Sequence, residues 1–141
     1  MSDMPVRRIW SLSNSGIGTT IAGSGNSGAY QVPGPPPWTP DNMSAIDLRY
    51  VDDVWLAVTV TAVSGGTLTV GLNVFDDLGN KFNVFTFSGA GILNAAGSAQ
   101  VSLGKHGATT GGYIVFPEWG QVAWTCSGGS VSGTEIALYG S

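Results

Sequence analysis

Hydrophobic and polar residues alternate with a period of two along most of the chain after residue 46. Residues 54–62 place an aliphatic row on one face: Leu56, Val58, Val60 and Ala62. After Ser64-Gly65-Gly66 the alternation resumes with a second inward row: Leu68, Val70, Leu72 and Val74. Successive side chains of a strand point to opposite faces of a sheet, so this period indicates half-buried strands. With the turn-forming residues at 76–80 and a third segment at 81–87, it predicts a three-stranded antiparallel meander.

Four more strands follow from the same pattern. They are expected at residues 99–103, 113–116, 121–126 and 134–139. The last two are expected to form a hairpin through Ser127-Gly128-Gly129-Ser130. No window places apolar residues at helical spacing between helix caps. The chain is therefore predicted to be all-β, an antiparallel two-layer β-sandwich of jelly-roll-like or immunoglobulin-like type.

The composition changes near residue 45, which predicts two parts. Residues 1–45 are rich in Gly, Ser and Pro and are expected to form an extended arm outside the core, with short strands at 6–10 and 29–32. Residues 46–141 are expected to form the sandwich domain. Within the arm, Pro35, Pro36 and Pro37 precede Trp38, and such a run favours a polyproline-like strap. We expect this strap to lay its aromatic residue on a neighbouring subunit.

Four aromatic residues have the sequence parity opposite to the aliphatic rows: Trp55, Phe75, Phe85 and Phe87. They are expected either to face a second layer of the domain or to lie exposed as an association patch. For the set as a whole, we expect at least one contact with another subunit.

Charge is scarce, which excludes one class of partner. Only 10% of the residues are charged, the net charge is −4, and Lys and Arg together number 5. Binding to nucleic acid depends on a basic patch that displaces counterions from phosphate, so no nucleic-acid partner is expected. The N-terminal residues lack the apolar core of a signal peptide, and no stretch of 18 apolar residues occurs. The sequence thus predicts synthesis in a cytoplasm without a secretion signal, and no membrane partner.

The residues that carry chemistry are few and poorly placed for it. His106 is the single histidine, Cys126 is the single cysteine and is expected to be buried, and no Gly-x-Ser-x-Gly motif accompanies them. Gly23-x-Gly25-x-x-Gly28 matches a dinucleotide fingerprint but precedes a proline run instead of a helix. Asp76, Asp77 and Asn80 are better explained as a turn than as a calcium loop. No catalytic residue, cofactor or metal site is expected.

Two segments carry a resemblance to a known group of proteins. Residues 68–82 read LTVGLNVFDDLGNKF, and residues 121–139 read QVAWTCSGGSVSGTEIALY. A hairpin with an Asp-x-Gly turn, then Val-x-Trp-Thr, a Gly-rich turn and an apolar alternation, resembles small β-sandwich virion proteins of tailed bacteriophages. The usual Gly-Thr-Ser-Pro turn of that group is replaced here by residues 128–133. The resemblance covers about two thirds of the chain and implies a capsid decoration (cement) protein, commonly a homotrimer on the shell.

The sequence therefore predicts a structural virion protein on the capsid surface, assembled in the host bacterial cytoplasm, with the major capsid protein and further copies of itself as partners. Two alternatives stay open. A tail or fibre module that binds host glycans would use exposed tryptophans as stacking platforms: Trp10, Trp38 and Trp119. A small hydrolase would need acidic residues and the histidine to meet in a cleft: Glu118, Glu135, Asp76 and His106.

Overall fold

The computed structural model describes residues 6–13, 19–28, 45–76, 79–104 and 119–141. In these residues the chain is almost entirely β, as predicted, and one short 3₁₀ turn, η2 (Gly89–Gly91), is present. The strands are β1 (Arg7–Ser11), β2 (Thr19–Asn26), β3 (Ile46–Asp47), β4 (Asp53–Val60), β5 (Ala62–Ser64), β6 (Thr67–Phe75), β7 (Lys81–Thr86), β8 (Gly97–Gly104) and β9 (Trp119–Gly140).

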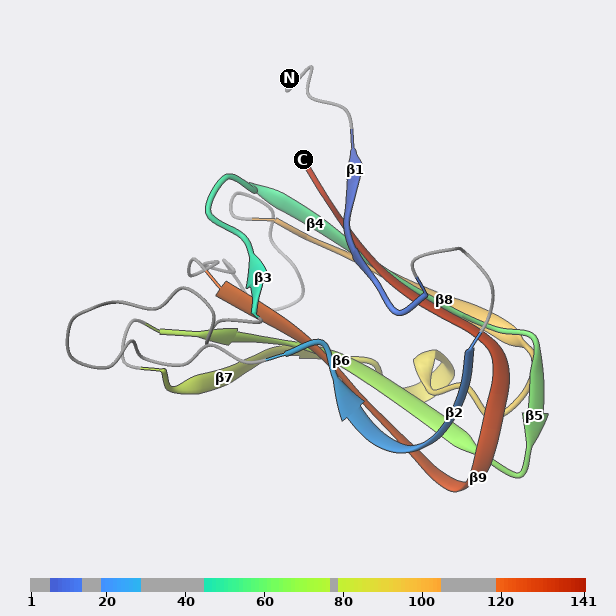
Figure 1. The fold of residues 1–141 in the computed structure, drawn as a ribbon. Coiled ribbons are helices and arrows are strands. Elements are labelled where there is room, and N and C mark those ends of the chain that lie inside the picture. The colour runs from blue at the N-terminus through green and yellow to red at the C-terminus, as the bar shows by residue number, and fades with distance from the viewer. Residues whose placement is uncertain (1–5, 14–18, 29–44, 77–78, 105–118) are drawn as a thin grey trace.

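The last strand, β9, organises the whole fold. It is 22 residues long and bends midway, so that its two halves lie in two facing layers (Figure 1). The N-terminal half pairs with β6 on one side and with β2 and β3 on the other; β7 lies beyond β6. The C-terminal half pairs with β4 and β1, and β8 lies beyond β4. We call these two arrangements the β6 layer and the β4 layer. Together they form one antiparallel sheet that curls on itself into a sandwich.

The bend of β9 corrects the predicted C-terminal hairpin. Residues 121–126 and 134–139 are not two paired strands; they are parts of one strand that passes from layer to layer. Gly128 and Gly133 have φ values of 80° and 57°, which side chains with a Cβ rarely adopt. They lie on either side of the stretch where β5 pairs with β9, from Ser64↔Ser130 to Ala62↔Ser132. The glycines therefore make the irregular steps of a bent strand, as at a β-bulge, and no reversal of the chain.

The predicted three-stranded meander is correct for one of its two pairings. β6 and β7 form an antiparallel hairpin, and its turn is held by Asn80, whose N–H donates to Asp76 Oδ1 at 2.8 Å. β4 does not pair with β6, because the chain crosses to the other layer through β5. The inward rows of β4 and β6 consequently face each other across the core, where each row covers the other.

The core lies between the two layers. The predicted inward positions of β4 and β6 are buried, whereas Ala62 is exposed. From β9, Val122, Ile136 and Leu138 are fully buried against these rows. Leu56 and Leu72, one from each layer, are also fully buried. Burying an aliphatic side chain of this size contributes about 1.5–3 kcal/mol, so the packing of these rows is the main stabilising contribution.

The N-terminal segment is more deeply involved than the sequence predicts. The expected strand at residues 6–10 is confirmed as β1. The expectation that the arm of residues 1–45 lies outside the core is wrong at Ile21, which is buried in the core cluster. Strand β2, which contains Ile21, is rich in Gly and Ser, and these small residues allow side chains of β9 to pack closely against it. A Cβ on Gly25 would lie 2.7 Å from the ring of Trp124, the residue opposite it on β9. The expected strand at 29–32 and the proline strap lie outside the described residues.

Candidate interaction surface

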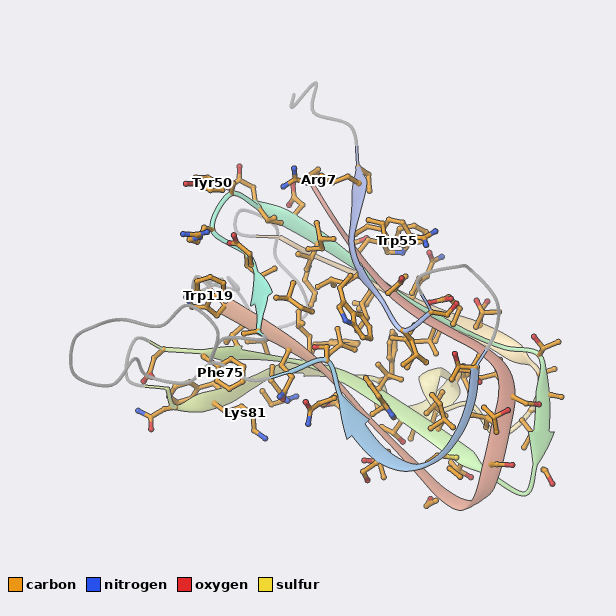
Figure 2. All side chains as sticks on the ribbon, in the orientation of Figure 1. Arg7, Tyr50, Trp55, Phe75, Lys81 and Trp119 are labelled. Carbon is orange, nitrogen blue, oxygen red and sulfur yellow. The ribbon has the colours of Figure 1, made fainter. Side chains whose placement is uncertain are left out.

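The outer face of the β4 layer carries an aromatic pair fixed by its neighbours. Trp55 of β4 and Tyr139 of β9 are cross-strand partners, with ring centroids 4.8 Å apart. The indole N–H of Trp55 donates to Gln100 Oε1 on β8 at 2.9 Å. From β1, the guanidinium of Arg8 lies 5.9 Å from the centroid of the Tyr139 ring, within the range of a cation–π contact. We call these four residues the Trp55 patch. Figure 2 shows Trp55 on the outside of this layer.

Small residues surround the patch and leave the sheet surface hollowed. Beside Trp55 and Tyr139 lie Ala57 and Ala137, which are also cross-strand partners. Together with the edge of β8 they line a shallow depression of about 310 Å³. Its far end is marked by Glu135, whose Oε1 accepts a hydrogen bond from the Ser13 N–H at 3.3 Å. The face thus combines rigid aromatic rings with a low concave floor.

The other three aromatic residues with this sequence parity come from β6, from β7 and from the position directly after β7. Phe75 and Phe87 are buried, at 4% and 6% exposure, and Phe85 is half-buried with its ring edge-on to Phe87 at 4.9 Å. The cause at Phe85 is a register shift opposite Leu72, which reverses the parity of β7 so that Phe85 faces inward. Trp38, Pro35, Pro36 and Pro37 lie outside the described residues.

Two of the tryptophans considered for glycan stacking already stack within the chain. Trp10 lies against Trp124, with centroids 6.1 Å apart and planes 25° from parallel. Arg49 lies over Trp119 at 5.1 Å and forms a two-point pair with Asp47, whose shorter distance is 2.8 Å. The hydrogen bond from Arg49 lowers the pKa of Asp47 below its usual value, so this pair remains ionised at neutral pH.

The groups considered for hydrolysis are not gathered by the described structure. Asp76 belongs to the β6–β7 turn, whereas Glu135 follows the bend of β9 opposite Thr59, and these positions lie at opposite ends of the sandwich (Figure 1). Glu118 and His106 lie outside the described residues. Within the described ranges, no three acidic, His or Cys side chains are grouped to hold a metal ion, and Cys126 is buried as expected. No helix of the described part is long and apolar enough to cross a membrane.

The sequence did not predict a row of amides on the outer face of the β6 layer, in which Asn73 and Gln121 are buried and Asn83 is exposed. Asn73 Nδ2 donates to Gln121 Oε1 at 3.0 Å, and Asn83 Nδ2 donates to Asn73 Oδ1 at 3.1 Å. Gln121 Nε2 donates in turn to the carbonyl of Gly28 at 2.9 Å. The row thus connects β7, β6, β9 and the end of β2. Each amide alone looks like a polar strand residue, and only the register of the strands reveals the row.

Substituting Gln121 with Ala is expected to destabilise the fold by about 1–3 kcal/mol, because Asn73 would keep a buried amide without its acceptor. Urea unfolding followed by fluorescence measures the change. Asn94→Ala, which removes an exposed amide, is the matched control and should change stability by less than about 0.5 kcal/mol. Equal effects of the two substitutions would show that the row contributes nothing.

Comparison with known proteins adds no family to this description: no protein-family profile matches the chain, and no curated protein matches it in sequence.

Proposed function

We propose that the chain is a structural subunit without catalytic activity, a decoration protein of a phage head. It would bind the major capsid protein through the outer face of its β4 layer, and it would do so as a homo-oligomer. The Trp55 patch is the observation that carries this proposal. Trp, Tyr and Arg are the residue types in which binding energy concentrates at protein interfaces, and here all three lie together on one sheet face.

The patch is already ordered before any partner binds. The Trp55 ring is held by the hydrogen bond to Gln100 and by the contact with Tyr139. Side chains that are fixed in advance lose little conformational entropy on association, which increases the net affinity for the same contact area. A rigid platform of this kind suits a protein whose role is to bind and to hold.

The scarcity of charge supports the same role. With 10% charged residues, a broad contact would desolvate few ionised groups. On the described outer face of the β4 layer, the charged side chains lie at its two ends: Asp53 and Arg8 near Trp55 and Tyr139, and Glu135 beyond the small residues. The stretch of that face between Trp55 and Glu135, which includes Ala57 and Ala137, therefore carries no charged side chain that would resist burial.

The test is binding of the purified chain to heads of the encoding phage that lack it, measured by co-sedimentation. Trp55→Ala is expected to weaken binding by about thirtyfold, since truncating a central aromatic anchor costs about 2 kcal/mol. Tyr50→Ala is the control, because Tyr50 is 78% exposed and lies outside the patch. Unfolding curves of both variants separate a binding defect from a folding defect. If Trp55→Ala bound heads as tightly as the parent, the outer face of the β4 layer would not be the binding surface. If the parent itself did not bind heads, the proposed role as a phage decoration protein would be wrong.

A further inference from the structure

The outermost strands of the two layers differ in how well they are protected from further pairing. β1 carries Arg7 and Arg8 and has a register shift beside them. β2 has two register shifts along its pairing with β9. β7 carries Lys81 and a register shift at its middle. Charges and bulges are the usual means by which proteins prevent an exposed edge from pairing with another chain.

β8 has none of these protections. All eight of its residues pair with β4 in unbroken register, from Val60↔Gly97 to Asp53↔Gly104. Its sequence, GSAQVSLG, contains no charged residue and no proline. Among the described residues β4 is its one strand partner, so the other side of β8 presents unpaired backbone groups. Ser98, Gln100 and Ser102 are exposed along it.

We propose that β8 pairs antiparallel with β8 of a second copy of this chain, about a two-fold axis at Gln100. In an antiparallel pair, residues directly opposite each other point to the same face. Centring on Gln100 sets Ser98 opposite Ser102, Ala99 opposite Val101, and Gln100 opposite itself. The outward pairs are then hydroxyl with hydroxyl and amide with amide, the inward pair is apolar, and no like charges meet.

The inner side of the same edge offers apolar surface that this pairing would cover. Ala99 and Val101 are half-buried at the edge of the core. With Phe85, Phe87 and the η2 turn they line an open hollow of about 340 Å³. A second β8 strand placed here brings its own Ala99 and Val101 against the hollow. Backbone hydrogen bonds and apolar burial would therefore favour the same contact.

The pairing extends the proposed function without depending on it. A two-fold axis perpendicular to the sheet keeps the outer faces of both β4 layers on one side. The joined sheet would then present two Trp55 patches in the same direction. Two linked weak contacts bind a surface much more tightly than one, through their effective concentration.

Sedimentation equilibrium of the full chain and two opposite charge variants tests the pairing. The parent is expected at twice the chain mass of 14.4 kDa at micromolar concentration. Gln100→Lys and Gln100→Glu should each dissociate at least about tenfold more readily, because each places like charges opposite each other at the axis. An equimolar mixture of the two variants should recover the doubled mass. Thr20→Lys adds the same charge on an exposed residue of β2 and should behave as the parent.

Recovery in the mixture is the decisive result, because a folding defect in either variant would not be cured by mixing. A parent that remains at the chain mass overturns the proposal, as does an oligomer that is unaffected by both substitutions at Gln100. Gln100 also belongs to the Trp55 patch, so head binding is measured with Trp55→Ala and not with the Gln100 variants. With separate variants and separate measurements, this pairing and the proposed function can fail independently.

Discussion

A chain from which residues 1–28 are removed is expected to lose the cooperative unfolding transition of the parent. The deletion removes β1 and β2, which together cover an edge of each half of β9. It also removes Ile21 from the core and leaves Trp124 without its stacking partner Trp10. Burial of two large apolar side chains contributes about 3–6 kcal/mol, a large part of the roughly 5–15 kcal/mol that holds a domain folded. Circular dichroism during heating measures the loss.

Removal of residues 1–5 alone is the control, since these residues precede β1. That shorter deletion should keep the melting temperature of the parent within a few degrees. If the longer deletion melted cooperatively at the same temperature as the parent, β1 and β2 would be dispensable strands laid on a core that is complete without them.

Substituting Gly133 with Ala is expected to destabilise the fold by about 2–4 kcal/mol. Its φ of 57° lies in the left-handed region, which costs a residue with a Cβ about 1–2 kcal/mol. The added Cβ would also lie 2.5 Å from Thr61 Cβ, and such overpacking costs about 1–3 kcal/mol. Thr61 has little room to move away, because its hydroxyl donates to the Gly133 carbonyl at 2.8 Å. The free energy of unfolding in urea gives the magnitude.

Gly97→Ala provides the comparison for this measurement. Gly97 begins β8, and the nearest atom to an added Cβ there is the Ala95 carbonyl oxygen at 4.0 Å. Its φ is outside the left-handed range, so the change should stay within about 0.5 kcal/mol of the parent. A loss at Gly133 no larger than that at Gly97 would mean that the bend of β9 tolerates a side chain.

Much of the strand content was predictable because two layers bury regular rows of aliphatic residues. The alternation correctly predicted β4, β6, β8 and the β6–β7 hairpin. Asp76 and Asn80 form that hairpin's turn through bonds between their own side chains and backbone, which is why local sequence was enough there. The all-β sandwich follows from these elements.

The wrong predictions concern glycines, because a glycine occurs both in turns or loose segments and at positions where strands bend or pack closely. Gly128 and Gly129 resemble a hairpin turn in the sequence, yet they lie in a bend whose course is set by β5, more than 60 residues earlier. Gly25 was assigned to an extended arm outside the core, yet it gives Trp124 room to lie over β2. Neither structure can be predicted from the neighbouring residues in the sequence, because each depends on which distant strand pairs with the segment.

The candidate surface was predictable only in part. Trp55 lies on the outer face, which is one of the two positions that its sequence parity left open, but Tyr139 and Arg8 become its neighbours only through the register of β4, β9 and β1. Phe85 has the outward parity in the sequence, but a register shift in the β6–β7 pairing turns it inward, and the alternation of residue types alone does not reveal such a shift. The unprotected edge of β8 becomes visible only once the other edges are known to be shifted or charged.

The position of β9 in the chain also governs the order in which the protein can be made. A ribosome completes β1 to β8 before it reaches residue 119, yet β1, β2, β3 and β5 have their pairing partner in β9. Until then, of the strand pairs among the described residues, only β4 with β8 and β6 with β7 can form. The nascent chain therefore carries its earliest strands unpaired for most of its synthesis, and the sandwich closes in a late step between distant segments. Such closure is slow, and it leaves apolar strands open to chaperones and to neighbouring nascent chains.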